Sequence, residues 1–589
     1  KKEDGQGQYL YTPAQDEIVG PITGPEKETA DRNAKGTAPN AKQGNVVSGM
    51  YNESTPTTKT NPMIVDMNGF NLNVAAESDN KIADAVYVGN NDYITVKNDA
   101  GKKIGITSTN TNTRAANGIF LEGNSHLNIT GPVEIAKVHT KGSSAAGIAF
   151  QGSGSEAVID GSLTISNVDG DKAEKQGRYI GVSGIRMTGD NTSMTVTGPV
   201  NISGFKGSAL HTAGADSVIS VGGGTISTAA DADKSHNFYA ARVEKGTVNI
   251  NMKNGAPGSA RTNIIGDMYV TGQYGKKVIE YSGGQLADWQ HRGNLHVALT
   301  DKDSSWTGVA AYEQYNDNYG SGGNTMHDIG NFDLYLQNGA TWTNEQQSHV
   351  TTTTLAGKNP VYNGSYLMKL HGGSDAVHKG YIYQKDSKPI TVDNYSGHTL
   401  VFYDHTGDGS AAENYSAGDF RIKTAEEGSS ITLRTGAGGI NTADKTAAGK
   451  ALNSLANKLY YMSYAQGDTK LKGTVEIAEG LTSSSVSASG DIAFRTDTAA
   501  DKNGQGTYVY EPEEPLDGPI IKDRLLKGET TVTADDTHAE DGYVSAAYNG
   551  DDSITVDMAN HGLRLEAASS ASAQAAAVRV GKGPDGNQK

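Results

Sequence analysis

Cysteine is absent from the 589-residue chain. Its absence excludes disulfide bonds, cysteine nucleophiles and thiolate metal sites. No apolar run approaches the roughly eighteen residues of a membrane-spanning helix, and no apolar region follows Lys1–Asp4, so no signal peptide is expected at this start. Lys and Arg (50) are outnumbered by Asp and Glu (67), which gives a formal net charge of −17. Such a chain is not expected to bind nucleic acid, whose phosphates require concentrated basic residues.

Glycine, in contrast, is abundant, at 74 of 589 residues, well above the usual share of roughly 7%. The hydrophobic fraction is only 35%, but the apolar residues fall in short bursts that alternate with polar ones. Disordered chains lack such bursts, and this alternation is typical of β-strands with one buried face. The chain is too long for one globular core, so several domains or a solenoid are expected.

Four short blocks near the start return in the same order near the end. They are Gly5–Tyr11 and Gly504–Tyr510, Gly20–Ile22 and Gly518–Ile520, Val65–Met67 and Val556–Met558, and Val86–Gly89 and Val578–Gly581. The spacing predicts one unit of about five hundred residues and the start of a second copy. Tandem units of this size suit a fibre or stalk better than a compact enzyme, although repetition alone does not exclude catalysis.

A shorter repeat, clearest between residues 117 and 251, predicts the fold. Each copy holds three short strands, as in Gly118–Leu121, Leu127–Ile129 and Gly131–Ile135. One such turn cannot enclose a core, whereas stacked turns bury one face of every strand. The chain is therefore predicted to be all-β, a right-handed parallel β-helix with three strands per turn and insertions in its corner loops.

The same repeat assigns inward residues and corners. Two inward columns of isoleucine are expected, Ile119, Ile148 and Ile185 in one and Ile135, Ile165 and Ile202 in the other. Gly and Gly-Pro are expected at the corners, where the chain bends sharply.

One segment departs from the strand pattern. Between Thr442 and Met462, three leucines (Leu452, Leu455 and Leu459) fall on one helical face. We predict an amphipathic helix of about five turns here, lying along the flank of the β-helix or covering its end.

Several motifs resemble a known protein family. Ser304–Gly308 reads Ser-Ser-Trp-Thr-Gly, and Leu334–Trp342 reads Leu-Tyr-Leu-Gln-Asn-Gly-Ala-Thr-Trp. With Gly364–Met368 and Ser396–Leu400, these motifs resemble the passenger domains of Gram-negative autotransporter (type V secretion) adhesins, and Asn453–Leu481 resembles large passengers of diderm anaerobes. The resemblance implies a β-helical passenger of a large tandem-repeat surface protein. It also implies an extracellular location, an outer-membrane-anchored parent, and an outer-membrane β-barrel translocator elsewhere in the parent chain.

These patterns divide the chain into six segments. They are the inter-repeat junction and start of the β-helix (1–62), a β-helix with long corner loops (63–300), autotransporter-like later turns (301–440), the amphipathic helix (441–464), the final strands of the repeat unit (465–503) and the start of the next tandem repeat (504–589).

Patterns that would indicate catalysis are weak. Polysaccharide-degrading β-helix enzymes need clustered carboxylates, and Asp231 and Asp233, near Lys234 and Arg242, are better interpreted as a solvated corner loop. Gly407–Ser410 scrambles the Gly-Asp-Ser-Gly loop of autotransporter proteases and is interpreted as a turn. No catalytic residue is assigned.

Two Asp-rich turns, Asp404–Gly409 and Asp501–Gly506, have oxygen ligands at alternate positions, as a calcium loop does. The closing acid is missing, because Tyr415 and Pro512 stand at position twelve. Tight turns are the preferred interpretation, and calcium binding stays an alternative. No His-x-x-x-His pattern supports a zinc site, so neither a metal nor a cofactor is assigned.

Contact surfaces are the remaining candidates. Tyr312, Tyr315 and Tyr319 are interleaved with Asn and Asp, which suits a polar-aromatic recognition surface or, equally, a solvated insertion. Four strand-exterior residues suit association between the flanks of neighbouring copies. They are Thr164, Thr195, Asn201 and Asn249. The resemblance to autotransporter passengers implies that Trp306 and Trp342 are core or turn-packing residues, with a sugar-stacking role as the alternative.

The sequence therefore predicts an extracellular adhesin or fibre repeat that acts by multivalent contact and not by catalysis. Cell–cell aggregation, biofilm formation and attachment are the expected outcomes. The partner would be a second copy of the chain or a ligand on a host or bacterial surface. Two alternatives are a purely structural surface fibre or stalk and a β-helical polysaccharide-degrading enzyme.

Overall fold

In the computed structural model, the chain divides into two compact units, Lys1–His371 and Gly372–Lys589. The structure describes residues 62–66, 71–78, 82–98, 101–171, 181–227, 238–270, 293–317, 324–328, 330–347, 361–405, 415–436, 454–463 and 467–476, together with short strands elsewhere. Among these described residues, no helix is both long and apolar enough to cross a bilayer.

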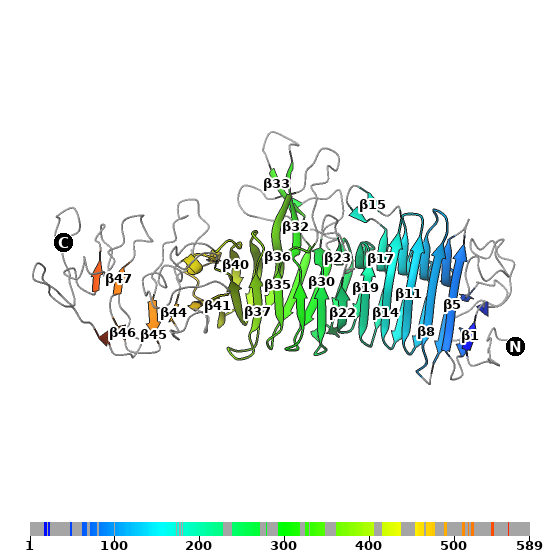
Figure 1. Ribbon diagram of the computed structural model, residues 1–589, viewed down its shortest axis with the longest axis horizontal. Coiled ribbons are helices and arrows are strands. Elements are labelled where there is room, and N and C mark those ends of the chain that lie inside the picture. The colour runs from blue at the N-terminus through cyan, green and yellow to red at the C-terminus, as the bar shows by residue number, and fades with distance from the viewer. Residues whose placement is uncertain are drawn as a thin grey trace, which may run out of the picture. The chain divides into compact units, whose positions relative to one another are not determined.

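Parallel strands of the first unit stack in three columns, and the chain passes through each column once per turn (Figure 1). The first column comprises β6 (Ala83–Val88), β9 (Ala116–Leu121), β12 (Ala145–Phe150), β17 (Val182–Met187), β20 (Ser208–Thr212), β23 (Tyr239–Val243), β28 (Asp267–Val270) and the start of β32 (Ala310–Asp317). The second comprises β4 (Met63–Asp66), β7 (Tyr93–Lys97), β10 (His126–Thr130), β13 (Glu156–Asp160), β18 (Ser193–Val196), β21 (Val218–Val221), β24 (Thr247–Ile250), β30 (Asn294–Leu299), β34 (Asn331–Leu336) and the end of β36 (Val361–His371). The third comprises β5 (Asn71–Ser78), β8 (Ile104–Asn110), β11 (Val133–Thr140), β14 (Leu163–Gly170), β19 (Val200–Phe205), β22 (Gly224–Ser227), β27 (Thr262–Ile265), β31 (Ser305–Thr307) and β35 (Thr341–Asn344). The predicted all-β, right-handed parallel β-helix with three strands per turn is therefore confirmed in this unit.

Alternating side chains of the second and third columns build the core, as the sequence pattern predicts. In the first column, β6, β9 and β12 are buried at every position, so both faces of these strands are covered. Both isoleucine columns are confirmed. Ile119, Ile148 and Ile185 are register partners in the first column, and Ile135, Ile165 and Ile202 are register partners in the third, all at most 1% exposed. Since burying one such side chain stabilises a fold by about 1.5–3 kcal/mol, each added turn contributes to the stability of the turn before it.

The expectation that glycines lie at corners is wrong for the glycines near the start of each predicted turn. Gly118, Gly147 and Gly184 lie inside first-column strands, not at bends. A Cβ atom on Gly147 would lie 2.6 Å from the carbonyl oxygen of Gly184 and 2.8 Å from Cγ2 of Ile165. These positions are glycine because the first and third columns approach closely there, a constraint that composition alone does not distinguish from a turn.

Corners between the first and second columns instead have a left-handed backbone two residues before five of the second-column strands. Five successive turns place Asn91, Asn124, Gly154, Asn191 and Asp216 there, with φ between 52° and 77°. Asn, Asp and Gly adopt this conformation at the least steric cost. The residue that follows is buried and polar at all five corners, and these residues are Asp92, Ser125, Ser155, Thr192 and Ser217.

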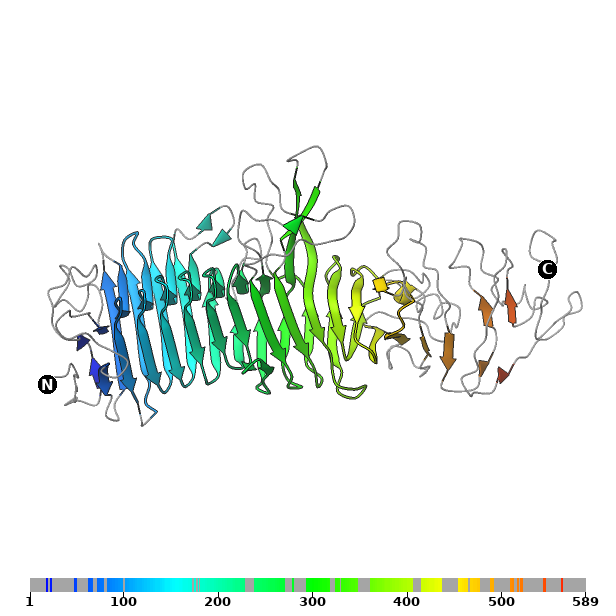
Figure 2. The ribbon, with the colours of Figure 1, turned by 180° about the vertical axis from the view of Figure 1, so that it is seen from behind.

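The first unit also contains short antiparallel strand pairs. They include β15 (Glu174–Lys175) with β16 (Arg178–Tyr179), β25 (Met252–Lys253) with β26 (Ala256–Pro257), and β33 (Asn324–Asp328), which pairs with β29 (Val278–Ile279) and the second half of β32. Both views show β32 and β33 standing out from the stacked strands (Figure 1 and Figure 2). Strand β32 thus begins in the first column and ends in a projecting hairpin.

The second unit also stacks parallel strands, and its described strands between Gly380 and Glu476 form two columns. One comprises β37 (Gly380–Gln384), β39 (His398–Tyr403), β41 (Ser429–Thr435) and β43 (Leu471–Glu476), and the other comprises β38 (Ile390–Ser396), β40 (Phe420–Ala425) and β42 (Leu459–Tyr461). Strands β44 (Ala488–Asp491) and β45 (Val509–Pro512) then add antiparallel to β43. Pairing is therefore antiparallel directly after β43, whereas β46 (Leu516–Asp517) pairs in parallel with β49 (Leu563–Arg564), and β47 (Ile520–Lys522) pairs in parallel with β48 (Val544–Ala546).

The predicted amphipathic helix of 441–464 is wrong at its C-terminal end. Residues 454–456 are helical, but Leu459–Tyr461 forms β42, where Leu459 pairs with Phe420 of β40. Leu455 and Leu459 are both fully buried, so the leucine spacing predicted burial correctly but not the conformation. Pairing with β40 satisfies the backbone of 459–461 in place of a helix. Residues 437–453, with most of the predicted helix, lie outside the described residues.

Candidate functional site

The four predicted flank residues lie in two rows on different sheets. Thr164 of β14 and Asn201 of β19 are direct register partners in the third column. Thr195 and Asn249 lie in the second column, joined through Ser220, whose hydroxyl accepts a hydrogen bond from Nδ2 of Asn249 at 3.1 Å. The structure thus brings together two pairs of the four residues. Their role in contact stays a prediction.

The third-column pair belongs to a longer row that sequence reasoning missed. Six register partners in successive turns form this third-column polar row: Thr164, Asn201, Thr225, Asn263, Ser305 and Thr341. None of the six is buried or charged, and Ser305 donates a hydrogen bond to Oδ1 of Asn263 at 3.0 Å. Ile265, 47% exposed, lies two residues from Asn263 on the same strand. In the sequence, the row corresponds to an uncharged polar residue at the same strand position in each of these turns. This recurrence is visible only when the turns are aligned with one another.

The second-column row differs because it carries charge. Beyond Asn249 it continues through His296, Asp333 and Lys369. Nδ1 of His296 lies 3.4 Å and Nζ of Lys369 4.0 Å from Oδ2 of Asp333. The charged side chains of this row pair with one another. The row is therefore less suited than the third-column polar row to hydrogen bonding with uncharged groups of a second copy.

The predicted tyrosine surface is only partly placed. Tyr312 and Tyr315 lie on β32, where Tyr315 pairs with Met326 of β33 in the projecting hairpin. Tyr319 lies outside the described residues, and so do the side chains of Tyr312 and Tyr315. Whether the three tyrosines form a recognition surface stays a prediction.

Trp306 and Trp342 are core residues, which confirms the preferred interpretation and excludes sugar stacking in this conformation. Both side chains are fully buried, and their indole Nε1–H groups donate to the carbonyl oxygens of Gly266 (3.0 Å) and Gly308 (2.9 Å). A buried indole usually needs such a partner. No face of either ring is open to a ligand.

Most of the weak chemical patterns fall on residues outside the described part of the chain. Asp231, Asp233 and Lys234, the Gly407–Ser410 turn and the Asp501–Gly506 turn lie outside the described residues. Of the first Asp-rich turn only Asp404 and His405 are described, and Tyr415 is buried.

A charged cluster on the outward side of the first column was not predicted. Arg186, His211 and Arg242 are register partners in three successive turns. Nη2 of Arg242 lies 2.6 Å and Nε2 of His211 3.4 Å from Oε1 of Glu244. Burial by itself would raise the pKa of Glu244, but the hydrogen bond from His211 and the charge of Arg242 lower it to about 2. Burial lowers the pKa of His211, so the carboxylate is charged and the imidazole neutral at pH 7.

Histidine and carboxylate pairs recur between turns of the first unit. The pairs are His126 with Glu156, His139 with Asp171, His211 with Glu244, and His296 with Asp333. In the described part of the chain, one of these pairs has a second carboxylate near enough to share a metal ion, namely His139 and Asp171 with Asp169. Sequence motifs missed this group because His139 and Asp169 are one whole turn apart.

No protein-family model matches the chain, and no curated protein matches its sequence. It is similar to the crystal structure of the autotransporter UpaB from E. coli strain CFT073, at 13% sequence identity and a TM-score of 0.34, covering 79% of this chain and 93% of that chain. The β-helical fold itself rests on the strand register described above.

Proposed function

We propose that the chain is a repeat unit of an extracellular surface adhesin, and that it acts by contact between its exposed flank and a second copy. The third-column polar row carries this proposal, because it presents uncharged hydrogen-bonding side chains at the same position in six successive turns. Rows of this kind can face one another in register, since turns repeat at the strand spacing of about 4.8 Å.

Each contact along such a row is weak, with a net contribution of about 0.5–1.5 kcal/mol per hydrogen bond. Many contacts held on one scaffold add up, because the first one raises the effective concentration of the others. Exposed Ile265 adds an apolar surface beside the row. Cell–cell aggregation and biofilm formation follow from this mechanism, and catalysis has no part in it.

The parent protein belongs, in this proposal, to the autotransporter-like surface proteins, with an outer-membrane β-barrel translocator and further tandem copies outside the chain. The resemblance of Ser304–Gly308 and Leu334–Trp342 to autotransporter passengers supports it. A ligand on a host or bacterial surface is the other partner that the proposal allows.

Display of the chain on non-adherent bacteria tests the proposal. Displaying cells should settle together, and bare cells mixed with them should stay in suspension. A double variant, Asn201→Lys and Asn263→Lys, should abolish settling, because it places like charges opposite one another in a self-complementary interface. Thr195→Lys, on the second column, is the matched control and should settle like the unaltered chain. If displaying cells do not settle, homotypic contact is wrong, and binding to glycans or matrix proteins would then separate a foreign ligand from a structural stalk.

A further inference from the structure

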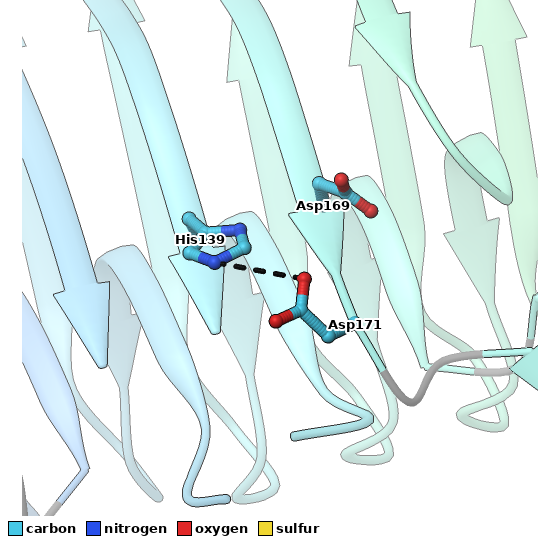
Figure 3. A group of neighbouring side chains, drawn as sticks. All are labelled: His139, Asp169 and Asp171. Atoms are coloured by element: carbon cyan, nitrogen blue, oxygen red, sulfur yellow. Dashed lines mark ion pairs between the residues drawn. The ribbon is translucent and has the colours of Figure 1, made fainter. Parts of the chain in front are cut away.

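His139, Asp169 and Asp171 meet at the C-terminal end of two third-column strands in successive turns. His139 is the second-last residue of β11 and is the register partner of Asp169 in β14, and Asp171 directly follows β14. One nitrogen or oxygen atom from each of the three side chains lies within 4.8 Å of the others. Figure 3 shows the imidazole of His139 facing the carboxylate of Asp171.

The spacing is close to that of a metal site. Nε2 of His139 lies 3.7 Å from Oδ1 of Asp171, and two ligand atoms on a tetrahedral zinc ion lie about 3.4 Å apart, given bonds of about 2.1 Å. Both side chains are accessible, with 29% of His139 and 52% of Asp171 exposed. A small rotation of either side chain would bring the two atoms to the distance that zinc requires.

Asp169 is held on its other side by a lysine. Its carboxylate is turned away from His139 in Figure 3, and Nζ of Lys206, one turn further along, lies 3.0 Å from its Oδ2. The backbone N–H of Gly170 donates to its Oδ1 at 2.7 Å. A carboxylate has about four lone-pair positions, so these two bonds leave room for a further ligand bond once the side chain rotates.

We propose that His139, Asp169 and Asp171 form a site for a divalent transition metal ion, with zinc as the ion that fits best. One imidazole and two carboxylates form a mixed nitrogen and oxygen set, which suits zinc better than calcium or magnesium, since these prefer oxygen ligands only. Water completes the coordination. Lys206 supplies the positive charge beside Asp169 when no metal is bound, and it competes with the metal.

A metal at this position links two turns of the β-helix. It would bind the folded chain and not the unfolded one, where the two turns are separated by some thirty residues of free chain, so it would raise the thermal stability. The site is independent of the third-column polar row, and the proposal does not rest on the adhesive function.

Calorimetric titration of the full chain with zinc chloride, after treatment with a chelator, tests the site. We expect saturable zinc binding, with an affinity that falls by about tenfold or more in His139→Ala and in Asp171→Asn. Loss of a residue that only hydrogen-bonds to a metal ligand already lowers metal affinity by about tenfold, and loss of a ligand itself should lower it at least as much. Circular dichroism establishes that each variant is folded. Calcium chloride in place of zinc should give no comparable heat.

His126→Ala is the matched control. Nδ1 of His126 lies 3.4 Å from Oε2 of Glu156, with 26% and 50% of the two side chains exposed, so this pair resembles His139 and Asp171 but has no second carboxylate in the same group. Zinc affinity should be unchanged in His126→Ala. The site is wrong if His139→Ala binds zinc as tightly as the unaltered chain, or if His126→Ala loses as much affinity.

Lys206→Gln gives a result in the opposite direction. It removes the ammonium that is ion-paired with Asp169, so zinc affinity should rise by up to about fivefold, given the modest value of an exposed ion pair. Weaker zinc binding in Lys206→Gln would overturn the proposed competition. A merely structural role of the three residues gives no reason for a gain of affinity.

Discussion

Trp306 and Trp342 are register partners in successive turns, with ring centroids 4.8 Å apart and ring planes 4° from parallel. Both rings lie inside the first unit and are fully buried. The separation equals the strand spacing of a β-sheet, about 4.7–4.9 Å, so the two indoles stack at the spacing that the backbone imposes. Identical aromatic residues at the same position of successive turns can therefore stack on one another without any change in the backbone.

Trp342→Ala should destabilise the first unit by about 3–5 kcal/mol, because it removes a large buried ring and leaves a cavity. The shift of the urea unfolding midpoint measures this loss. Trp342→Phe keeps an aromatic ring but loses the donor to Gly308, so a smaller loss is expected. Equal midpoints for the Ala and Phe variants would contradict the role given to stacking and ring burial.

Asn191 occupies a corner with φ of 53°. Asn191→Val should destabilise the fold by about 1–2 kcal/mol, because a β-branched residue is disfavoured in the left-handed region, while Asn191→Gly should be nearly neutral. Thermal unfolding followed by circular dichroism measures both. Asn201→Val, on the outer face of β19, is the control and should be tolerated, because strands favour valine. Similar losses at both positions would count against a backbone origin.

Ser217 is one of the five buried polar residues that follow the left-handed corner residues, and it lies at the corner one turn after Asn191. Its hydroxyl donates to the carbonyl oxygen of Gly189 at 2.7 Å and accepts from the backbone N–H of Thr192 at 3.2 Å. Ser217→Ala should cost about 1–3 kcal/mol, because it leaves buried polar groups without this partner. Ser220→Ala, on the outer face of the neighbouring strand β21, should change the unfolding midpoint little. The comparison tests whether the buried hydroxyl of Ser217 stabilises the fold.

Acid should weaken the cluster around Glu244. Its pKa in the folded chain, about 2, is below the ordinary 4.5, so its contribution is complete above about pH 4.5 and is lost as the pH falls toward 2. Burial also lowers the pKa of His211 from 6.5, so below that pH the unfolded chain binds a proton more readily and stability falls further. For Glu244 the loss is at most about 3 kcal/mol.

Melting temperatures between pH 7 and pH 3 measure this effect. In Glu244→Gln the melting temperature at pH 7 should be lower, and its fall on acidification should be shallower than in the unaltered chain. Parallel curves for the two proteins would mean that other carboxylates account for the whole acid response.

The sequence by itself determined the β-helical fold. Alternation of apolar and polar residues with recurring glycine predicted stacked turns of three strands, and it placed Ile119 over Ile148 and Ile135 over Ile165, because those patterns are local and repeat. The resemblance to autotransporter passengers, and not this alternation, predicted that the tryptophans are core or turn-packing residues. The end of the helix near Leu459 was wrong, since the same leucine spacing fits a helix and a buried strand preceded by a helical turn.

Only the tertiary structure decided which distant side chains meet. Turn length varies with the corner loops, so the sequence could not align Thr164 with Thr225 and Thr341 in one uncharged row. Nor could it place Asp169 beside His139, or Lys206 beside Asp169. Those neighbours are one full turn apart along the chain and adjacent in space, because hydrogen bonding between parallel strands, and not sequence proximity, sets the register that brings them together.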